Sequence, residues 1–250
     1  MEKSSRATRI VEVGSQISPL ETGLKLSVVI PTLNEAAVLG ETLAALQACR
    51  DRIEIIVVDG GSLDDTLLVA RGLADRIITN EPGRARQMNA GASLATGKTL
   101  LFLHADTLLP KDFHQLIGNA LSQTGSLWGR FDIQFSPSTP TLNLIAWMIN
   151  KRSRLTRICT GDQAIFVRSS IFRDFGRFTE IPLMEDIELT SRLRYLTPPA
   201  CIETRAVTSS RRWIEKGTLR TVMLMWRLRL LYWLGVPAER LANLYYPNRR

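Results

Sequence analysis

Blocks of apolar residues alternate with polar turns along the first half of the chain. Leu26 to Ile30 and Ile53 to Val58 are short, nearly unbroken apolar runs rich in β-branched residues, the pattern of strands covered on both faces in a parallel sheet. Each run is followed by a polar turn and then by apolar residues at helical spacing. The start of the chain therefore predicts a βαβα order.

The alternation continues with predicted strands at Arg76 to Thr79 and Thr99 to Leu103, and a helix at Ala85 to Ala95 between them. This order predicts an α/β fold with a mostly parallel central sheet and helices on both faces. In such sheets ligands bind beyond the carboxyl ends of the strands.

The second half of the chain is less regular, with strands expected at Trp128 to Phe135 and Ala164 to Val167. We expect a flexible leader over 1–24, a main domain over 25–215 and a basic, aromatic helical appendage over 216–250. A chain of 250 residues with 45% apolar content fits one large domain.

Polar residues gather at the carboxyl ends of the predicted strands. The segment from Asp59 to Ser62 offers a carboxylate that can accept from a base or ribose, followed by glycines that let the backbone approach a ligand. The alternative is an ordinary helix cap. Thr32 and Asp106 fall at the same predicted edge, so three polar signals converge there.

His104 and Asp106 lie two residues apart, so on an extended backbone both side chains would face the same way. A carboxylate with an imidazole suits Mn²⁺ or Mg²⁺ that bridges phosphate oxygens. For His104 a hydrogen-bonded structural role is the alternative.

Glu185 and Asp186 open a predicted helix. Acidic residues stabilise the positive end of a helix dipole whatever their function. The functional interpretation is a general base that takes a proton from an acceptor hydroxyl.

The charge balance favours anionic partners. The sequence has 32 Lys and Arg against 24 Asp and Glu, a net charge of +8, and the surplus is concentrated after residue 150. Nucleic acid, acidic lipid and a diphosphate-bearing substrate all fit this charge.

The sequence favours a cytoplasmic location. No apolar run of secretory length is visible near the N-terminus, and an odd number of widely spaced cysteines argues for reduced thiols. The cysteines are Cys49, Cys159 and Cys201.

Other nucleotide and hydrolase motifs are absent or misplaced. Ala92 to Thr99 matches a relaxed phosphate loop, but a helix precedes it and a strand follows, the reverse of a true phosphate loop. No G-x-G-x-x-G follows the first strand, and no G-x-S-x-G is present.

The chain resembles family 2 glycosyltransferases in five segments that occur in the family's order. They are Val28 to Glu35 (VVIPTLNE), Val57 to Thr66 (VVDGGSLDDT), Gly83 to Gly91 (GRARQMNAG), Phe102 to Asp106 (FLHAD) and Glu185 to Leu189 (EDIEL). The resemblance covers about residues 25 to 215. It implies a Rossmann-like, nucleotide-sugar-binding GT-A fold and inversion at the anomeric carbon by a single displacement.

The resemblance also implies roles for individual residues. Those expected to hold the nucleotide sugar are Pro31, Thr32, Asn34, Glu35, Asp59, Gly60, Ser62, Arg86 and Asn89. Asp106 matches the last Asp of the D-x-D metal motif, and Asp186, beside Glu185, matches the base that activates the acceptor. The chain departs from the family where Gly60 replaces the usual second Asp and His104 the first Asp of D-x-D.

A narrower resemblance is to a bacterial subgroup named for its association with radical-SAM proteins and, in some cases, arsenosugar biosynthesis. It rests on GRARQMNAGA, FLHAD, Gly161-Asp162-Gln163 and the Arg212-Trp213 region. The last two segments could shape the acceptor side. The alternative is a core tryptophan beside a solvated arginine.

The most apolar stretch is Val222 to Val236. Its two central arginines cost about 5 to 7 kcal/mol in a bilayer, more than so short a span recovers, so we expect it not to cross a membrane. Leu219, Met223, Trp226, Leu230 and Trp233 form one helical stripe. The stripe could pack on the main domain, or it could lie on an anionic membrane surface with Arg220, Arg227 and Arg229.

We therefore expect a cytoplasmic, metal-dependent inverting glycosyltransferase with a nucleotide-sugar donor and no nucleic-acid partner. Its acceptor could be lipid-linked or a small molecule, and a peripheral contact with the cytoplasmic face of the membrane is an open alternative. A second hypothesis is a catalytically silent nucleotide-sugar or membrane-surface binding protein, suggested by Gly60 and His104. A nucleotidyltransferase is disfavoured because no glycine-rich loop with a lysine for a triphosphate is present near the N-terminus.

Overall fold

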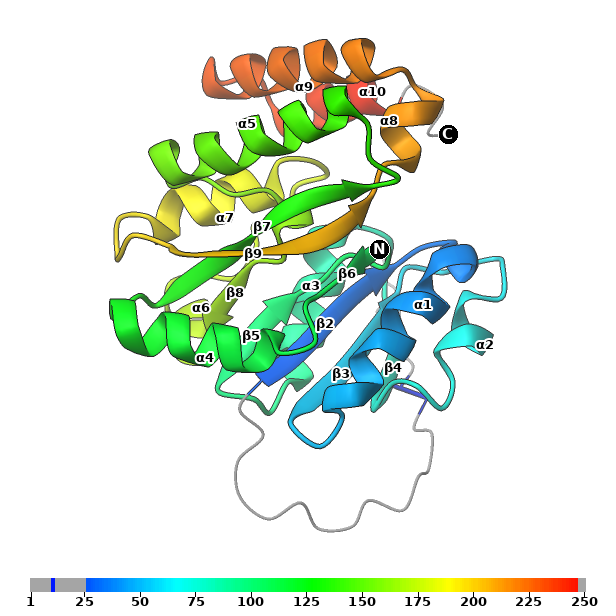
Figure 1. Cartoon of the computed structure of the whole chain (residues 1–250). Coiled ribbons are helices and arrows are strands. Elements are labelled where there is room, and N and C mark those ends of the chain that lie inside the picture. Colours follow the sequence, from blue (N-terminus) through cyan, green and yellow to red (C-terminus); the bar gives the residue numbers. More distant parts are fainter. Residues whose placement is uncertain (1–9, 12–25, 247–250) are drawn as a thin grey trace, which may run out of the picture.

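The structure, a computed structural model, describes residues 10–11 and 26–246 (Figure 1). Strands of this part form one nine-stranded sheet in the order β1-β4-β3-β2-β5-β8-β7-β9-β6. The strands are β1 (Ile10–Val11), β2 (Leu26–Thr32), β3 (Ile53–Asp59), β4 (Arg76–Thr79), β5 (Thr99–Phe102), β6 (Thr107–Leu108), β7 (Trp128–Ser136), β8 (Phe166–Arg168) and β9 (Ala200–Ser209). The rest of the predicted leader lies outside the described residues.

The centre of the sheet is parallel. Strands β4, β3, β2 and β5 pair in parallel, and Thr32 stands opposite Asp59 at their carboxyl ends. β8 runs antiparallel to both β5 and β7, which joins the parallel centre to the parallel pair of β7 and β9. The prediction of an α/β fold with a mostly parallel central sheet is confirmed, and it places two of the predicted site residues side by side.

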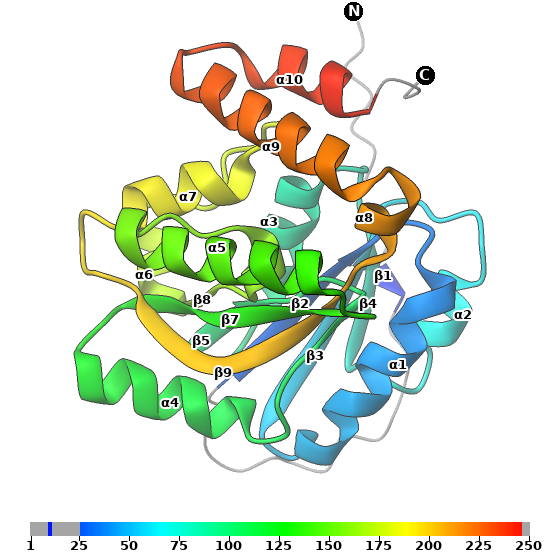
Figure 2. The ribbon, with the colours of Figure 1, turned by 45° about the horizontal axis from the view of Figure 1, so that its top comes forward.

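Helices cover both faces of the sheet (Figures 1 and 2). Val28 and Ile30 of β2 pack under α1 and α4, whereas Val29 packs with α3, α6 and α7 on the other face. This alternation follows from the two-residue period of a strand. The longer helices are α1 (Ala36–Leu46), α3 (Arg84–Leu94), α4 (Phe113–Thr124), α5 (Pro140–Thr156), α7 (Glu185–Leu193), α9 (Thr218–Trp233) and α10 (Ala238–Tyr245). The shorter ones are α2 (Thr66–Ala70), α6 (Ser169–Asp174), α8 (Arg211–Glu215) and two 3₁₀ turns, η1 (Gln47–Cys49) and η2 (Gly161–Gln163).

The predicted elements agree with the observed ones to within a few residues. The helix expected from Ala85 is α3, which begins one residue earlier at Arg84. The strand expected from Ala164 is β8, which begins only at Phe166 because Ala164 sits in a turn with φ +47°. Cys49, Cys159 and Cys201 all lie in the described part and are free.

The C-terminal helices α9 and α10 lie over α7, on its side away from the sheet (Figures 1 and 2). Leu228 of α9 and Leu241 of α10 are buried with Met184 and Ile187, around the start of α7. Across residues 10–11 and 26–246, no helix is both long and apolar enough to span a bilayer. The main domain and appendage predicted to meet at residue 215 therefore share a packed apolar cluster, and that boundary stays a prediction.

Candidate active site

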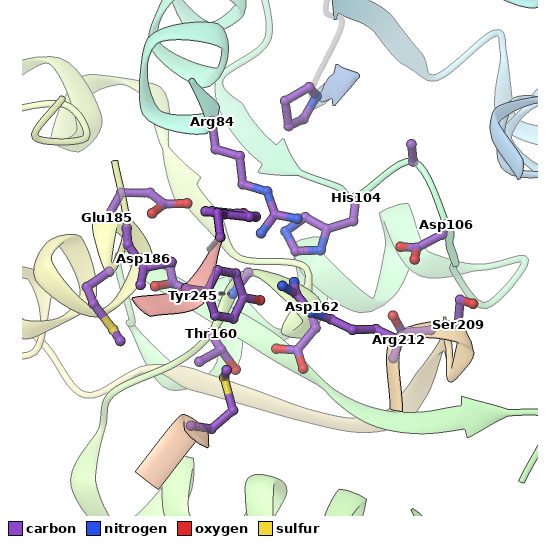
Figure 3. Close-up of a pocket in the computed structure, with 18 of the residues that line it drawn as sticks. Arg84, His104, Asp106, Thr160, Asp162, Glu185, Asp186, Ser209, Arg212 and Tyr245 are labelled. Atoms are coloured by element: carbon purple, nitrogen blue, oxygen red, sulfur yellow. Dashed lines mark hydrogen bonds between the residues drawn. The ribbon is translucent and has the colours of Figure 1, made fainter. Parts of the chain in front are cut away.

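A cavity of about 770 Å³ lies beyond the carboxyl end of β2 (Figure 3). Both halves of the chain contribute to its walls. The first half supplies Pro31, Thr32, Glu35, Arg84, Gln87, His104 and Asp106. The second half supplies Thr160, Gly161, Asp162, Glu185, Asp186, Arg212, Trp213, Arg229, Tyr245 and Tyr246. The structure thus brings together eleven of the predicted site residues, namely Pro31, Thr32, Glu35, His104, Asp106, Gly161, Asp162, Glu185, Asp186, Arg212 and Trp213.

Asp59 holds the loop after β3 in place. One carboxylate oxygen accepts hydrogen bonds from the backbone N–H groups of Gly61 and Ser62, both at 2.8 Å, and the other accepts from Thr32 Oγ1 at 3.3 Å. The Ser62 hydroxyl in turn accepts from the Asn34 N–H at 2.8 Å, and the Asn34 side chain accepts from the backbone of the same loop. Asp59 is fully buried. These bonds fix the two loops that follow β2 and β3.

Gly60 faces a side chain that the sequence analysis did not single out. The Gln87 amide donates to the carbonyl oxygens of Thr32 and Val58, at 2.7 and 2.8 Å. A Cβ atom added at Gly60 would lie 3.2 Å from the Gln87 nitrogen. Gln87 therefore occupies the space beside the position where the family's usual second Asp is replaced by glycine. The sequence signal that could have identified Gln87 is a polar residue on the same side of α3 as the apolar residues Ala85 and Met88.

Arg86 and Asn89 lie outside the cavity wall. Arg86 pairs with Glu81 at 2.8 Å and with Glu180 at 3.4 Å, and its side chain is 45% exposed. Asn89 is buried and exchanges hydrogen bonds with the backbone of Phe178, donating at 2.8 Å and accepting at 3.0 Å. Their observed contacts are structural: Asn89 ties α3 to the segment before α7.

Arg84 is the arginine of this segment that lines the cavity, and its guanidinium points into it near His104 and Glu185 (Figure 3). Burial alone lowers the pKa of Arg84, but Tyr246, Glu185 and other groups around the cavity raise it, and the net shift is upward. Arg84 is also the first residue of α3. A guanidinium at a helix N-terminus suits an anionic group such as a diphosphate.

His104 and Asp106 lie in the turn between β5 and β6, not on the extended strand that was predicted for them, and both line the cavity. The Thr107 N–H donates to the His104 carbonyl at 3.2 Å and closes a turn. The His104 ring lies against Gly161, where an added Cβ would be 2.5 Å from Nε2. Burial and the charge of Arg84 lower the pKa of His104 to about 3, so the imidazole is neutral at pH 7.

Asp106 faces the cavity (Figure 3), and Glu35 lines the same cavity. Burial and the charge of Asp106 raise the pKa of Glu35, while Arg211 lies 3.4 Å from the Glu35 carboxylate. Within the part of the chain that the structure describes, no three His, Cys, Asp or Glu side chains gather as a ready metal site. One carboxylate at a cavity wall still fits a hard cation that takes its other oxygens from phosphate and water.

Glu185 and Asp186 begin α7 at the cavity wall. Asp186 Oδ2 accepts from the Gly161 N–H at 2.7 Å and Oδ1 accepts from the Ile187 N–H at 2.7 Å. Glu185 is buried, and burial followed by the charge of Asp186 raises its pKa to about 7. The two carboxylates therefore differ: Asp186 is held by backbone donors, whereas Glu185 carries a proton for part of the time at neutral pH.

The 3₁₀ turn η2 supplies Gly161 and Asp162 to the cavity, while Gln163 points away from it. Gln163 is fully buried, donates to Ser153 Oγ at 3.1 Å and accepts from the Thr160 N–H at 3.3 Å. Asp162 Oδ1 is buried without a hydrogen-bond partner, and burial raises the pKa of this carboxyl. Gln163 thus shapes the turn, and Asp162 offers a polar atom for a bound molecule.

Arg212 and Trp213 also line the cavity. The Arg212 guanidinium lies 3.8 Å from the centre of the Tyr245 ring, a cation–π contact. Trp213 meets Phe135 edge-on with 5.4 Å between ring centres. Trp213 therefore serves both the core and the cavity, and Arg212 is tied to the C-terminal helix. Tyr245 and Arg229 were not predicted as site residues because they belong to the tract regarded as an appendage, where Arg229 was grouped with the arginines that could face a membrane; it lines the cavity instead.

Residues 27–177 match the sequence pattern of the family described as Glycosyl transferase family 2. A PGL/p-HBAD biosynthesis glycosyltransferase of Mycobacterium bovis is 46% identical over 92 residues, which is 33% of this chain and 36% of that protein. The match thus spans about a third of that relative's length. This relative is named for PGL/p-HBAD biosynthesis, so it does not support the narrower radical-SAM and arsenosugar resemblance.

Two solved structures share the fold. Glucosyl-3-phosphoglycerate synthase from Mycobacterium tuberculosis, in complex with Mn²⁺ and UDP-glucose, has a TM-score of 0.58 at 19% identity and covers 85% of this chain and 80% of its own. S. aureus TarS 1-349 in complex with UDP-GlcNAc has a TM-score of 0.57 at 19% identity and covers 74% of this chain and 58% of its own. At this identity the likeness shows the fold alone.

Proposed function

The chain belongs to glycosyl transferase family 2, and on that premise we propose that it moves a sugar from a nucleotide-diphosphate sugar to an acceptor hydroxyl, with inversion at the anomeric carbon. The observation that supports this most is the shared cavity. Its wall carries the end of β2 on one side and the carboxylates of α7 on the other. A donor and an acceptor could meet there.

The donor would enter at the ends of β2 and β3. Thr32 and Glu35 line the cavity, and Asp59, Asn34 and Ser62 hold the loops around it. The diphosphate would then lie near Arg84 at the start of α3 (Figure 3). A planar guanidinium can bind two phosphate oxygens at once and stabilise the charge that grows on the departing nucleoside diphosphate.

Asp186 would act as the general base. The acceptor oxygen attacks the anomeric carbon, the bond from that carbon to the diphosphate oxygen breaks, and the acceptor proton passes to the Asp186 carboxylate. The contacts from Gly161 and Ile187 hold this carboxylate at the cavity wall. General-base catalysis of this kind typically contributes about 10² to 10⁴ in rate. Glu185, which also lines the cavity, would be a second, partly protonated carboxyl beside it.

A divalent ion, Mn²⁺ or Mg²⁺, would be held by Asp106. When bound, such an ion offsets negative charge on the diphosphate. His104 would contribute a neutral nitrogen, because its imidazole is uncharged at pH 7. The M. tuberculosis synthase noted above was solved with Mn²⁺, which supports this proposal without deciding the ligand set.

The acceptor side would be formed by Gly161, Asp162, Arg212 and Trp213. A lipid-linked or a small-molecule acceptor both fit a cavity of this size, and the arsenosugar association stays a prediction. The competing proposal is a nucleotide-sugar binding protein without turnover. It is supported by the departures from the family pattern at Gly60 and His104 and by the absence, among the described residues, of a ready three-ligand metal site.

The decisive experiment is release of free nucleoside diphosphate from a panel of nucleotide sugars, with Mn²⁺, with Mg²⁺ and with chelator. We expect metal-dependent release from one donor, and a loss of about 10² or more in Asp186→Asn with donor binding retained. Asp51→Asn is the matched control, because Asp51 is an exposed carboxylate outside the cavity wall. Near-normal turnover in Asp186→Asn would refute the base assignment, and donor binding without release from any donor would favour the binding protein.

A further inference from the structure

Helix α9 carries two different apolar faces. Leu224, Leu228 and Leu231 pack toward α7 and α10, and Met225 and Arg229 line the cavity. The opposite face holds the stripe identified in the sequence, and it is exposed: Leu219 by 73%, Met223 by 64%, Trp226 by 61%, Leu230 by 56% and Trp233 by 81%. The helix thus packs on the main domain, as one of the two alternatives assumed, but it does so through its other face and leaves the stripe exposed.

The exposed face is long and continuous along the helix. Residues 219, 223, 226, 230 and 233 recur at spacings of three and four, so they lie in one row. At a rise of 1.5 Å per residue the row is about 21 Å long. Two of its five side chains are tryptophans, which an aqueous surface disfavours but a membrane interface accommodates. Soluble proteins rarely leave such a row uncovered.

The charge of the side chains next to the stripe indicates which kind of surface could cover it. Lys216, Arg220 and Arg227 are exposed on or beside the helix, and Arg227 and Arg220 flank the stripe on one side. From residue 216 to residue 238 the chain contains no acidic side chain; Glu215 and Glu239 flank this segment. Apolar and aromatic side chains beside unopposed basic ones fit a surface that is apolar below and anionic above.

We propose that α9 docks on an anionic lipid bilayer, with Trp226 and Trp233 inserted at the level of the headgroups and Arg220 and Arg227 against the lipid phosphates. The helix lies in the plane of the interface and does not span it. Because the opposite side of α9 lines the cavity, the bilayer would lie one helix diameter, about 10 Å, from the site. The docking itself does not depend on glycosyl transfer.

The test is co-sedimentation of the full chain with vesicles of phosphatidylcholine alone or with phosphatidylglycerol added. We expect binding to the anionic vesicles, a loss of at least about tenfold in the partition coefficient for Trp226→Ser/Trp233→Ser, and a loss of about fivefold per residue for Arg220→Gln/Arg227→Gln. Leu68→Ser and Arg52→Gln/Arg71→Gln are matched controls, because these exposed side chains lie far along the chain from α9. All of these variants are expected to keep nucleoside diphosphate release in the absence of vesicles.

Three results would overturn the proposal. They are equal binding to neutral and anionic vesicles, unchanged binding of the tryptophan variant, or no vesicle binding together with a dimer in light scattering that the tryptophan variant converts to a monomer. The last result would assign the stripe to a second copy of the chain. Tryptophan fluorescence that shifts to shorter wavelength with anionic vesicles in the wild type, and less in the double variant, gives a second readout. Vesicle binding by a protein that releases no nucleoside diphosphate would refute the proposed function while leaving this inference intact.

Discussion

Two arginines of one helix provide a direct test of the proposed donor site. Arg84 and Arg86 stand two residues apart in α3, but only Arg84 lines the cavity, whereas Arg86 pairs with Glu81 and Glu180 at the surface. Their replacement by glutamine removes the same charge from the same helix. A general effect of net charge would therefore change both variants alike, and a local effect on a diphosphate would change one.

The expected magnitudes differ. A hydrogen bond to a charged group contributes about 1.5 to 3 kcal/mol, so Arg84→Gln should lower kcat/KM for the donor by about 10- to 150-fold. Arg86→Gln removes exposed ion pairs, which contribute about 0 to 1 kcal/mol to stability, and should leave kcat/KM within about twofold. Arg84→Lys keeps the charge without the planar fork and should fall between the wild type and Arg84→Gln.

The assay is release of nucleoside diphosphate at substrate concentrations well below KM, with thermal unfolding measured on every variant. Equal losses in Arg84→Gln and Arg86→Gln would refute the assignment, as would a wild-type rate in Arg84→Gln. If Arg84→Gln is too unstable to assay, then Arg84→Lys decides: a folded variant with a wild-type KM and kcat would show that no bidentate contact to the donor exists at this position.

The other predictions concern Gly161, Glu185 and the proposed ion ligand Asp106. Gly161→Ala places a methyl group 2.5 Å from His104 Nε2, so we expect kcat/KM to fall at least about tenfold. The control is Gly118→Ala, which has open space around it in α4 and should gain about 0.5 to 1 kcal/mol in stability. An unaffected kcat/KM in Gly161→Ala would contradict the geometry. Burial keeps Glu185 protonated to about pH 7, and since its pKa is about 4.5 when unfolded, the stability it contributes is full below pH 4.5 and is lost as pH rises to 7. Glu185→Gln should therefore gain in melting temperature relative to the wild type as pH increases, and parallel curves would refute the shift. Asp106→Ala should raise the Mn²⁺ concentration needed for half-maximal release by at least about tenfold, and an unchanged requirement would place the ion elsewhere.

The sheet could be predicted because its strands carry unmistakable patterns. The runs in β2 and β3 are apolar on both faces, which only a strand buried between two helical layers requires. Thr32 and Asp59 could be assigned to one edge because parallel strands end together. Such arguments need only the order of elements.

The parts of the site that could not be predicted depend on the exact residue at which a helix or a turn begins. His104 and Asp106 were predicted on an extended strand, whereas a hydrogen bond from the Thr107 N–H to the His104 carbonyl turns the chain at that point. Arg84 and Arg86 are equally polar in the sequence, and which one faces the cavity follows from where α3 begins. A shift of one residue rotates every side chain by about 100°, so patterns alone do not distinguish them.

The C-terminal helix shows the same limit for packing. Helix α9 is apolar around most of its circumference, so periodicity reveals an apolar row but not which row the fold covers. The buried row proved to contain Leu228, and the row with Trp226 proved to be exposed. Only the position of α7 and α10 decides between them.

The hydrogen bonds between the loops after β2 and β3 have a thermodynamic consequence. Asn34, Ser62 and Asp59 bind one another within the protein itself, and Glu35 and Thr66 add a further link at 2.8 Å. The conformational entropy of these loops is therefore lost when the protein folds and is not lost again when a nucleotide arrives. Donor affinity measured by calorimetry should then carry only a small ordering penalty, which leaves the free energy of each new contact available to discriminate one nucleotide sugar from another.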